Sequence, residues 1–122
     1  MEQDRSPMPR YPFFAHAELA VENSDFHLTA RLYELSREGC CLYVMNPLPV
    51  GTSVLLKVYA WPYFFQVHCK VFLSDPDFGV TVAFDQIESR YASELNACLL
   101  GVEQKQRNHT VDNPHRLVFS SC

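Results

Sequence analysis

No apolar run in the sequence approaches the roughly 20 residues that a membrane-spanning helix requires. The first ten residues, MEQDRSPMPR, are polar and contain no apolar stretch of the kind found in signal peptides. Basic residues are also few, because ten Lys and Arg stand against fourteen Asp and Glu for a net charge of -4. General nucleic-acid binding relies on many basic contacts to phosphate, so this balance argues against DNA or RNA as a partner. We therefore expect a cytoplasmic protein with no membrane insertion.

Motifs that would indicate a metal centre, redox chemistry or nucleophilic catalysis are absent from the sequence. The five cysteines, at positions 40, 41, 69, 98 and 122, include no C-x-x-C pair. The five histidines show no metal-ligand spacing. There is no Gly-rich phosphate loop and no G-x-S-x-G elbow. We expect reduced cysteines that pack as small apolar residues, no metal or cofactor, and no enzymatic activity.

Apolar residues instead recur at every second position over most of the chain, which is typical of strands with one buried face. The alternation predicts six short strands separated by polar, Pro-containing or Gly-containing turns. In the fifth strand it places Val71 and Leu73 together on the buried face. The expected strands cover residues 13–21, 28–32, 40–45, 54–58, 65–73 and 80–84.

The period then changes to that of a helix, with apolar residues at positions 87, 91, 95, 98 and 99 on one face. Gly101 is placed to end this helix. Together these elements predict an all-β fold, a six-stranded antiparallel barrel with a C-terminal α-helix that covers one open end or edge. We expect three parts: a flexible N-terminal arm over residues 1–12, the barrel and helix over 13–101, and a C-terminal tail over 102–122.

Two segments stand out from this framework. The first is the arm, in which Arg5 and Arg10 flank a stretch of Ser and Pro that resists both helix and sheet. The second is the turn after the second strand, which contains Ser36 and Gly39 and is preceded by Glu34. We expect a tight turn here, in which Gly39 is able to take a positive φ.

These segments, with two others, resemble the PilZ domain family. That family joins an Arg-x-x-x-Arg arm to an Asp/Asn-x-Ser-x-x-Gly turn, and here Arg10 and the run Ser36-Arg37-Glu38-Gly39 are similar to parts of both. The run Pro47-Leu48-Pro49-Val50-Gly51 looks like the family's PLPVG loop, and Phe78-Gly79-Val80-Thr81-Val82-Ala83-Phe84 looks like its last strand. The resemblance covers about residues 5 to 100.

The resemblance implies a receptor or effector domain that binds cyclic di-GMP, a bacterial second messenger, and signals as ligand binding orders its arm. Arginine offers a planar fork of donors that matches phosphate oxygens and the guanine O6 and N7 atoms. By resemblance, Arg10 would grip phosphate or guanine with Arg5 assisting, Glu34 and Ser36 would bind polar base edges, and Gly39 would shape the turn. A downstream effector protein is the implied partner.

Two positions depart from the family pattern. Arg5 and Arg10 are separated by four residues where the family has three, and Glu34 occupies the place of Asp or Asn. These departures keep a second hypothesis open, a degenerate PilZ module that binds no nucleotide and acts through protein–protein interaction. Its contact surface would be the stretch Trp61-Pro62-Tyr63-Phe64-Phe65, for which aromatic core packing is the alternative. An oligonucleotide-binding barrel is disfavoured by the acidic charge.

Overall fold

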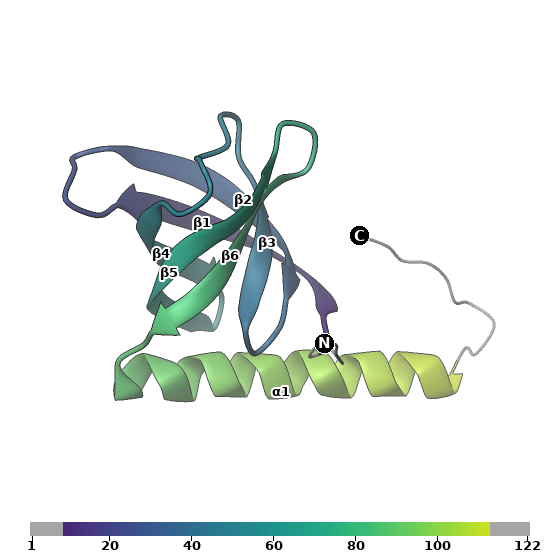
Figure 1. The fold of residues 1–122 in the computed structure, drawn as a ribbon. Coiled ribbons are helices and arrows are strands. Elements are labelled where there is room, and N and C mark those ends of the chain that lie inside the picture. Colours follow the sequence, from purple (N-terminus) through teal and green to yellow (C-terminus); the bar gives the residue numbers. More distant parts are fainter. Residues whose placement is uncertain (1–8, 113–122) are drawn as a thin grey trace, which may run out of the picture.

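The computed structural model describes residues 9–112, with side chains described through residue 105. All neighbouring strands are antiparallel, and the sheet closes into a barrel in the order β1-β2-β3-β6-β5-β4 (Figure 1). The predicted all-β class, the six-stranded barrel and the C-terminal helix are therefore confirmed. The elements are β1 (Tyr11–Val21), β2 (His27–Leu35), β3 (Gly39–Tyr43), β4 (Ser53–Ala60), β5 (Tyr63–Asp75), β6 (Gly79–Gln86) and α1 (Ser89–Asp112).

The barrel interior is filled by the apolar side chains that alternate along the strands. Leu19, Leu56 and Phe65 are fully buried there, while intervening residues such as Glu18 and Lys70 face outward. Burial of a large apolar side chain is worth roughly 1.5–3 kcal/mol, so this interior supplies most of the stabilisation of the fold. The period-two pattern thus predicts the core of the strands correctly.

Alternation fails at one place in β5. The register of β5 against β6 shifts between Val71 and Leu73, so that Phe72 is the extra residue of a β-bulge. Val71 is buried, but Leu73 is 57% exposed. The prediction that Leu73 lies on the buried face is therefore wrong, because the bulge turns it to the same outer side as Phe72.

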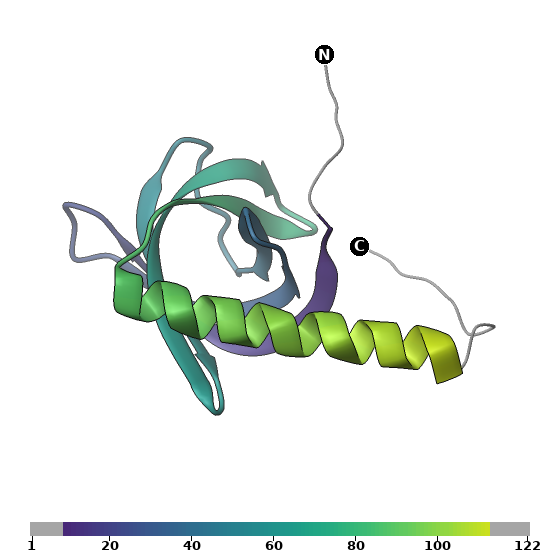
Figure 2. The same ribbon diagram turned by 90° about the horizontal axis from the view of Figure 1, so that it is seen from below.

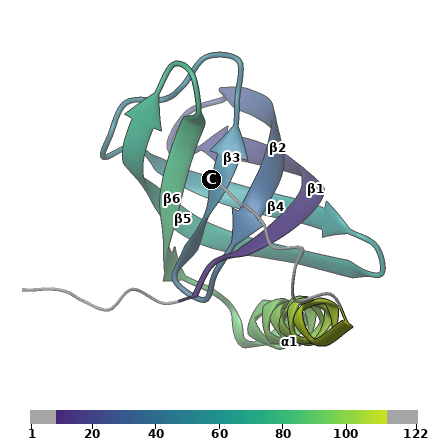
Figure 3. The same cartoon turned by 90° about the vertical axis from the view of Figure 1, so that its right-hand side faces the viewer.

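Helix α1 lies across one end of the barrel, as Figures 1 and 2 show, and packs mainly against β5. Viewed along its axis, the helix sits below the strands as a separate layer (Figure 3). Leu95, Cys98, Leu99 and Val102 form its buried face. The predicted apolar face is confirmed within the helix, whereas Ile87 packs against the core from the segment that precedes it.

The predicted end of the helix at Gly101 is wrong, because α1 continues to Asp112. Gly101 does not have a positive φ, and one glycine costs a helix interior only about 1 kcal/mol. Burial of Val102 against the barrel end favours the continuation. Residues 102–112 of the predicted C-terminal tail are thus helical. The predicted N-terminal arm over 1–12 also ends earlier than expected, because β1 begins at residue 11. Positions 1–8 and 113–122 lie outside the described residues. No helix within residues 9–112 is long and apolar enough to span a membrane.

Candidate functional site

The residue before β1 lies beside the end of β2. The guanidinium of Arg10 donates a hydrogen bond to Oε1 of Glu34 at 3.3 Å, across a sequence separation of 24 residues. The cause is the β1–β2 ladder, which pairs Tyr11 with Leu35 and Pro12 with Glu34. The Arg10 side chain is 56% exposed and the Glu34 side chain 13% exposed. An accessible cation is therefore anchored at one of its nitrogens by a largely buried carboxylate.

The turn between β2 and β3 is held by the hydroxyl of Ser36. Its Oγ donates to the carbonyl oxygen of Gly39 at 3.1 Å and accepts from the backbone N–H groups of Glu38 and Gly39, each at 3.2 Å. Ser36 is buried. A serine that bonds nearby backbone groups is a common way to fix a tight turn. The hydroxyl predicted to face a ligand is thus engaged within the turn itself.

Gly39 allows two strands to approach closely. Its φ is not positive, so the turn does not use the left-handed conformation that a glycine could adopt. A Cβ built at this position would overlap the backbone carbonyl oxygen of Val82, the partner of Cys40 on β6. The glycine is therefore required by the β3–β6 contact, and its expected role at a ligand site stays a prediction.

Three of the predicted site residues, Arg10, Ser36 and Gly39, line a single cavity of about 680 Å³. Glu34 is not one of its lining residues, but it contacts Arg10, which is. Arg5 lies outside the described residues. The cavity runs over the outer surface of β3, β6 and β5, and the rest of its lining comprises Arg37, Glu38, Cys40, Cys41, Phe72, Leu73, Thr81, Val82, Ala83 and Phe84.

Cys41 lies next to the acidic residue of the site. Its Sγ lies 3.4 Å from Oε1 of Glu34 and 3.5 Å from the hydroxyl of Thr81. Burial raises the pKa of the Cys41 thiol above its usual range. The thiol therefore stays protonated near neutral pH and is a poor nucleophile. Among the side chains described, no group of three His, Cys, Asp or Glu could hold a metal ion.

Arg37 also lines the cavity, but its guanidinium is tied to α1. It donates to Oδ1 of Asn96 at 2.9 Å and lies 3.5 Å from Oε2 of Glu103. These contacts join the β2–β3 turn to the helix. Of the two arginines in the cavity, Arg10 is therefore the more accessible to a ligand.

The sequence reasoning missed the apolar part of the cavity. Leu73 was predicted on the buried face of β5, but it lines the cavity together with Phe72, at 57% and 61% exposure. The available signal was the run Val71-Phe72-Leu73, three large apolar residues directly after a segment that alternates from Phe65 to Lys70. Such a run indicates that a strand is buried on both faces or carries a bulge, and sequence alone does not distinguish the two.

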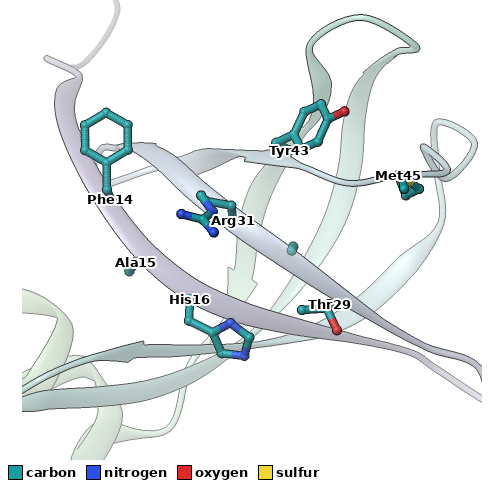
Figure 4. Close-up of a pocket in the computed structure, with 8 residues that line it drawn as sticks. Phe14, Ala15, His16, Thr29, Arg31, Tyr43 and Met45 are labelled. Carbon is teal, nitrogen blue, oxygen red and sulfur yellow. The ribbon is translucent and has the colours of Figure 1, made fainter.

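Two other hollows on the surface contain residues of a different kind. On the outer face of β1–β3, Arg31 lies between Phe14 and Tyr43, with His16 nearby (Figure 4). At the β4–β5 turn, Trp61 is 95% exposed and borders a hollow that reaches Val102 and Lys105 of α1. Neither contains any of the residues predicted to bind a ligand.

No family model matches the chain, and no curated protein matches it.

Proposed function

We propose that this protein binds cyclic di-GMP in the cavity beside the β2–β3 turn and acts as a non-catalytic receptor. One observation carries the proposal: Arg10, from the segment before β1, reaches Glu34 and lines the same cavity as Ser36 and Gly39. Arginine, acidic residue and Ser-x-x-Gly turn are the parts that the resemblance to PilZ domains assigns to the ligand. Their convergence supports the proposal on geometry rather than on motif order alone.

The chemistry of the ligand suits these groups. Cyclic di-GMP carries two phosphates and two guanines, and a guanidinium can donate to phosphate oxygens or to guanine O6 and N7. Arg10 uses one nitrogen on Glu34, so its remaining donors are available to the ligand. The Glu34 carboxylate is an acceptor for guanine N–H groups. A bidentate arginine contact is worth ~1–3 kcal/mol, against the ~8 kcal/mol that micromolar affinity requires.

The turn residues act mainly through the backbone in this proposal. Ser36 fixes the turn, and Gly39 lets β3 approach the backbone of β6 beside the cavity. Arg5 supplies a second cation. Because Arg10 directly precedes β1, a ligand held by Arg10 links residues 1–12 to the cavity, and a change in this segment would carry the signal to an effector protein in the cytoplasm.

Calorimetric titration of the full chain with cyclic di-GMP tests the proposal. We expect micromolar affinity for the wild type and at least tenfold weaker binding by Arg10→Ala. Arg31→Ala is the matched control, because it removes the same charge from a different hollow and should bind as the wild type does. A flat wild-type titration at high micromolar ligand would overturn the proposal, as would equal losses in both variants.

A second candidate function is a protein-interaction module that binds no nucleotide. The observation in its favour is Trp61, whose ring is almost fully exposed beside a hollow under α1. Large exposed aromatic side chains are enriched where proteins meet. A photo-crosslinker at position 61 would test this function, with position 24 in the β1–β2 turn as the control. A product formed only from position 61, and suppressed by excess unlabelled protein, would support the module.

A further inference from the structure

The outer face of β1, β2 and β3 carries large apolar side chains where the solvated face of a sheet is normally polar. Phe14 is 72% exposed, Tyr43 50% and Met45 80%. All three line the hollow of about 490 Å³ that also contains Arg31 (Figure 4). Single exposed apolar residues are ordinary, whereas a group of them around one hollow is typical of a binding surface. Aromatic residues, methionine and arginine are also the residue types enriched where proteins meet.

Strand pairing sets four outward side chains in a line, the outer row. Tyr59 of β4 is paired with His16 of β1, and the centroids of the two rings lie 5.6 Å apart. His16 is also paired with Arg31 of β2, which is paired in turn with Tyr43 of β3. Neighbouring strands are ~4.8 Å apart, so the outer row measures about 14 Å along the sheet, the length of about four residues of extended peptide. The row joins two hollows, because Phe14 and His16 line both the one at Arg31 and the one at the β4–β5 turn.

The charge of this surface is opposite to that of the chain. Among the described residues that line the two hollows, none is Asp or Glu, and Arg31 and Lys105 are positively charged. The chain as a whole has fourteen acidic residues against ten basic ones. Arg31 forms no ion pair with any residue whose side chain the structure describes, so its charge is not balanced there. The surface is therefore complementary to a carboxylate that stands next to apolar groups.

We propose that the outer row binds an acidic segment of a partner protein, with a carboxylate of that segment on Arg31 and its apolar side chains against Phe14 and Met45. A guanidinium binds a carboxylate with two parallel hydrogen bonds, which gives the contact direction as well as strength. Two cations are too few for general binding of nucleic acid, which relies on many phosphate contacts.

This surface is separate from the cavity proposed for cyclic di-GMP, because the two share no lining residue. The inference therefore does not depend on nucleotide binding. It rests on the second candidate function and deepens it, since it names the chemistry of the partner and extends the contact surface from the β4–β5 turn to β3.

A phage-displayed library of random peptides of about 12 residues, selected on the full chain, tests the chemistry of the partner. We expect the retained sequences to be enriched in Asp or Glu next to aromatic or aliphatic residues. A parallel selection on Arg31→Glu should not yield these sequences. Lys70→Glu is the matched control, because it reverses the charge of an exposed residue on β5 that lines neither hollow. It should yield the same sequences as the wild type.

Fluorescence anisotropy with the most enriched peptide measures the individual contacts. We expect Arg31→Glu and Phe14→Ala each to weaken binding by roughly tenfold or more, as removal of a central arginine or aromatic residue does at other interfaces. A charge-swapped peptide, in which Lys replaces each Asp and Glu, should bind Arg31→Glu more tightly than it binds the wild type. A merely structural effect of the substitution would not produce this reversal. The affinity of the acidic peptide should also fall as the salt concentration rises.

The outcomes separate this inference from the functions proposed above. Enrichment of basic or purely apolar peptides, no enrichment, or equal binding of the acidic peptide by the wild type and Arg31→Glu would overturn it. A partner crosslinked from position 61 that binds Arg31→Glu as well as the wild type would overturn the acidic contact and leave the interaction module standing. The affinity of Arg31→Glu for cyclic di-GMP should equal that of the wild type, and a large loss of it would show that the two surfaces are not separate.

Discussion

The guanidinium of Arg37 donates a hydrogen bond to Oδ1 of Asn96 at 2.9 Å, which joins the β2–β3 turn to α1. The same arginine lines the cavity. The turn, the helix and the candidate site are thus connected through one side chain. This contact adds a polar link between the turn and the helix to the apolar packing of α1.

We expect Arg37→Ala and Asn96→Ala each to lower the free energy of unfolding by about 0.5–1.5 kcal/mol, the usual net worth of such a hydrogen bond. The double variant should lose less than the sum of the two, because both changes remove the same interaction. Urea denaturation of the four proteins measures this coupling. Additive losses would show that the two side chains do not interact in solution.

Replacement of Gly39 by alanine should destabilise the barrel. The new Cβ would overlap the carbonyl oxygen of Val82, so β3 and β6 must move apart. We expect a loss of about 1–3 kcal/mol, the usual cost of overpacking, measured by urea denaturation. Gly101→Ala is the matched control. Its Cβ would lie 3.9 Å from the Tyr63 hydroxyl and it sits inside a helix, so it should stabilise the protein by about 0.5–1 kcal/mol. A stable Gly39→Ala protein would contradict the close approach.

Ser36→Ala should also be destabilising, by about 1–3 kcal/mol, because it leaves the buried N–H of Gly39 and the partly buried N–H of Glu38 without their acceptor. Ser24→Ala offers a comparison, since Ser24 Oγ accepts the N–H of Phe26 in an exposed turn. Thermal unfolding of both variants gives the difference. Equal melting temperatures would indicate that water replaces the Ser36 hydroxyl and that the turn does not depend on it.

Stability should fall at alkaline pH because of the buried thiols. Burial raises the pKa of Cys98 to about 11 and raises the pKa values of Cys40 and Cys69 as well. The unfolded thiols lose their protons from about pH 8.5 upward, while the folded ones stay protonated. Stability is therefore full below that pH and declines as the pH rises towards the folded pKa. Between about pH 8.5 and the folded pKa, we expect the stability of Cys98→Ala to decline less steeply with pH than that of the wild type. Parallel curves of stability against pH for the two proteins would contradict this.

The location of Arg10 was predictable because it depends on local order. A hairpin with its turn near residues 22–25 brings the end of the second strand back beside the start of the first, so Arg10 must lie near the Ser36 turn. The six strands of the barrel were predictable for the same reason, because alternating apolar residues and turn residues can be recognised within short segments. The strand cores and the inner face of the helix could be read in this way.

The remaining features depend on contacts that the sequence pattern does not encode. The exposure of Leu73 comes from a register shift against β6. The continuation of α1 beyond Gly101 is favoured by the burial of Val102 against the end of the barrel. The need for glycine at position 39 comes from the backbone of Val82 on β6. Each requires knowledge of the partner element. Tertiary context overrides the local signal in all three cases.

Closure of the sheet determines how another protein could engage this domain. Each strand of the barrel is hydrogen-bonded on both sides, because β4 returns to pair with β1. A partner therefore finds no free strand border among residues 9–112 on which to add a strand of its own. Recognition must use side chains, turns or the helix, and it can be altered by point substitutions at the surface that leave the backbone ladder intact.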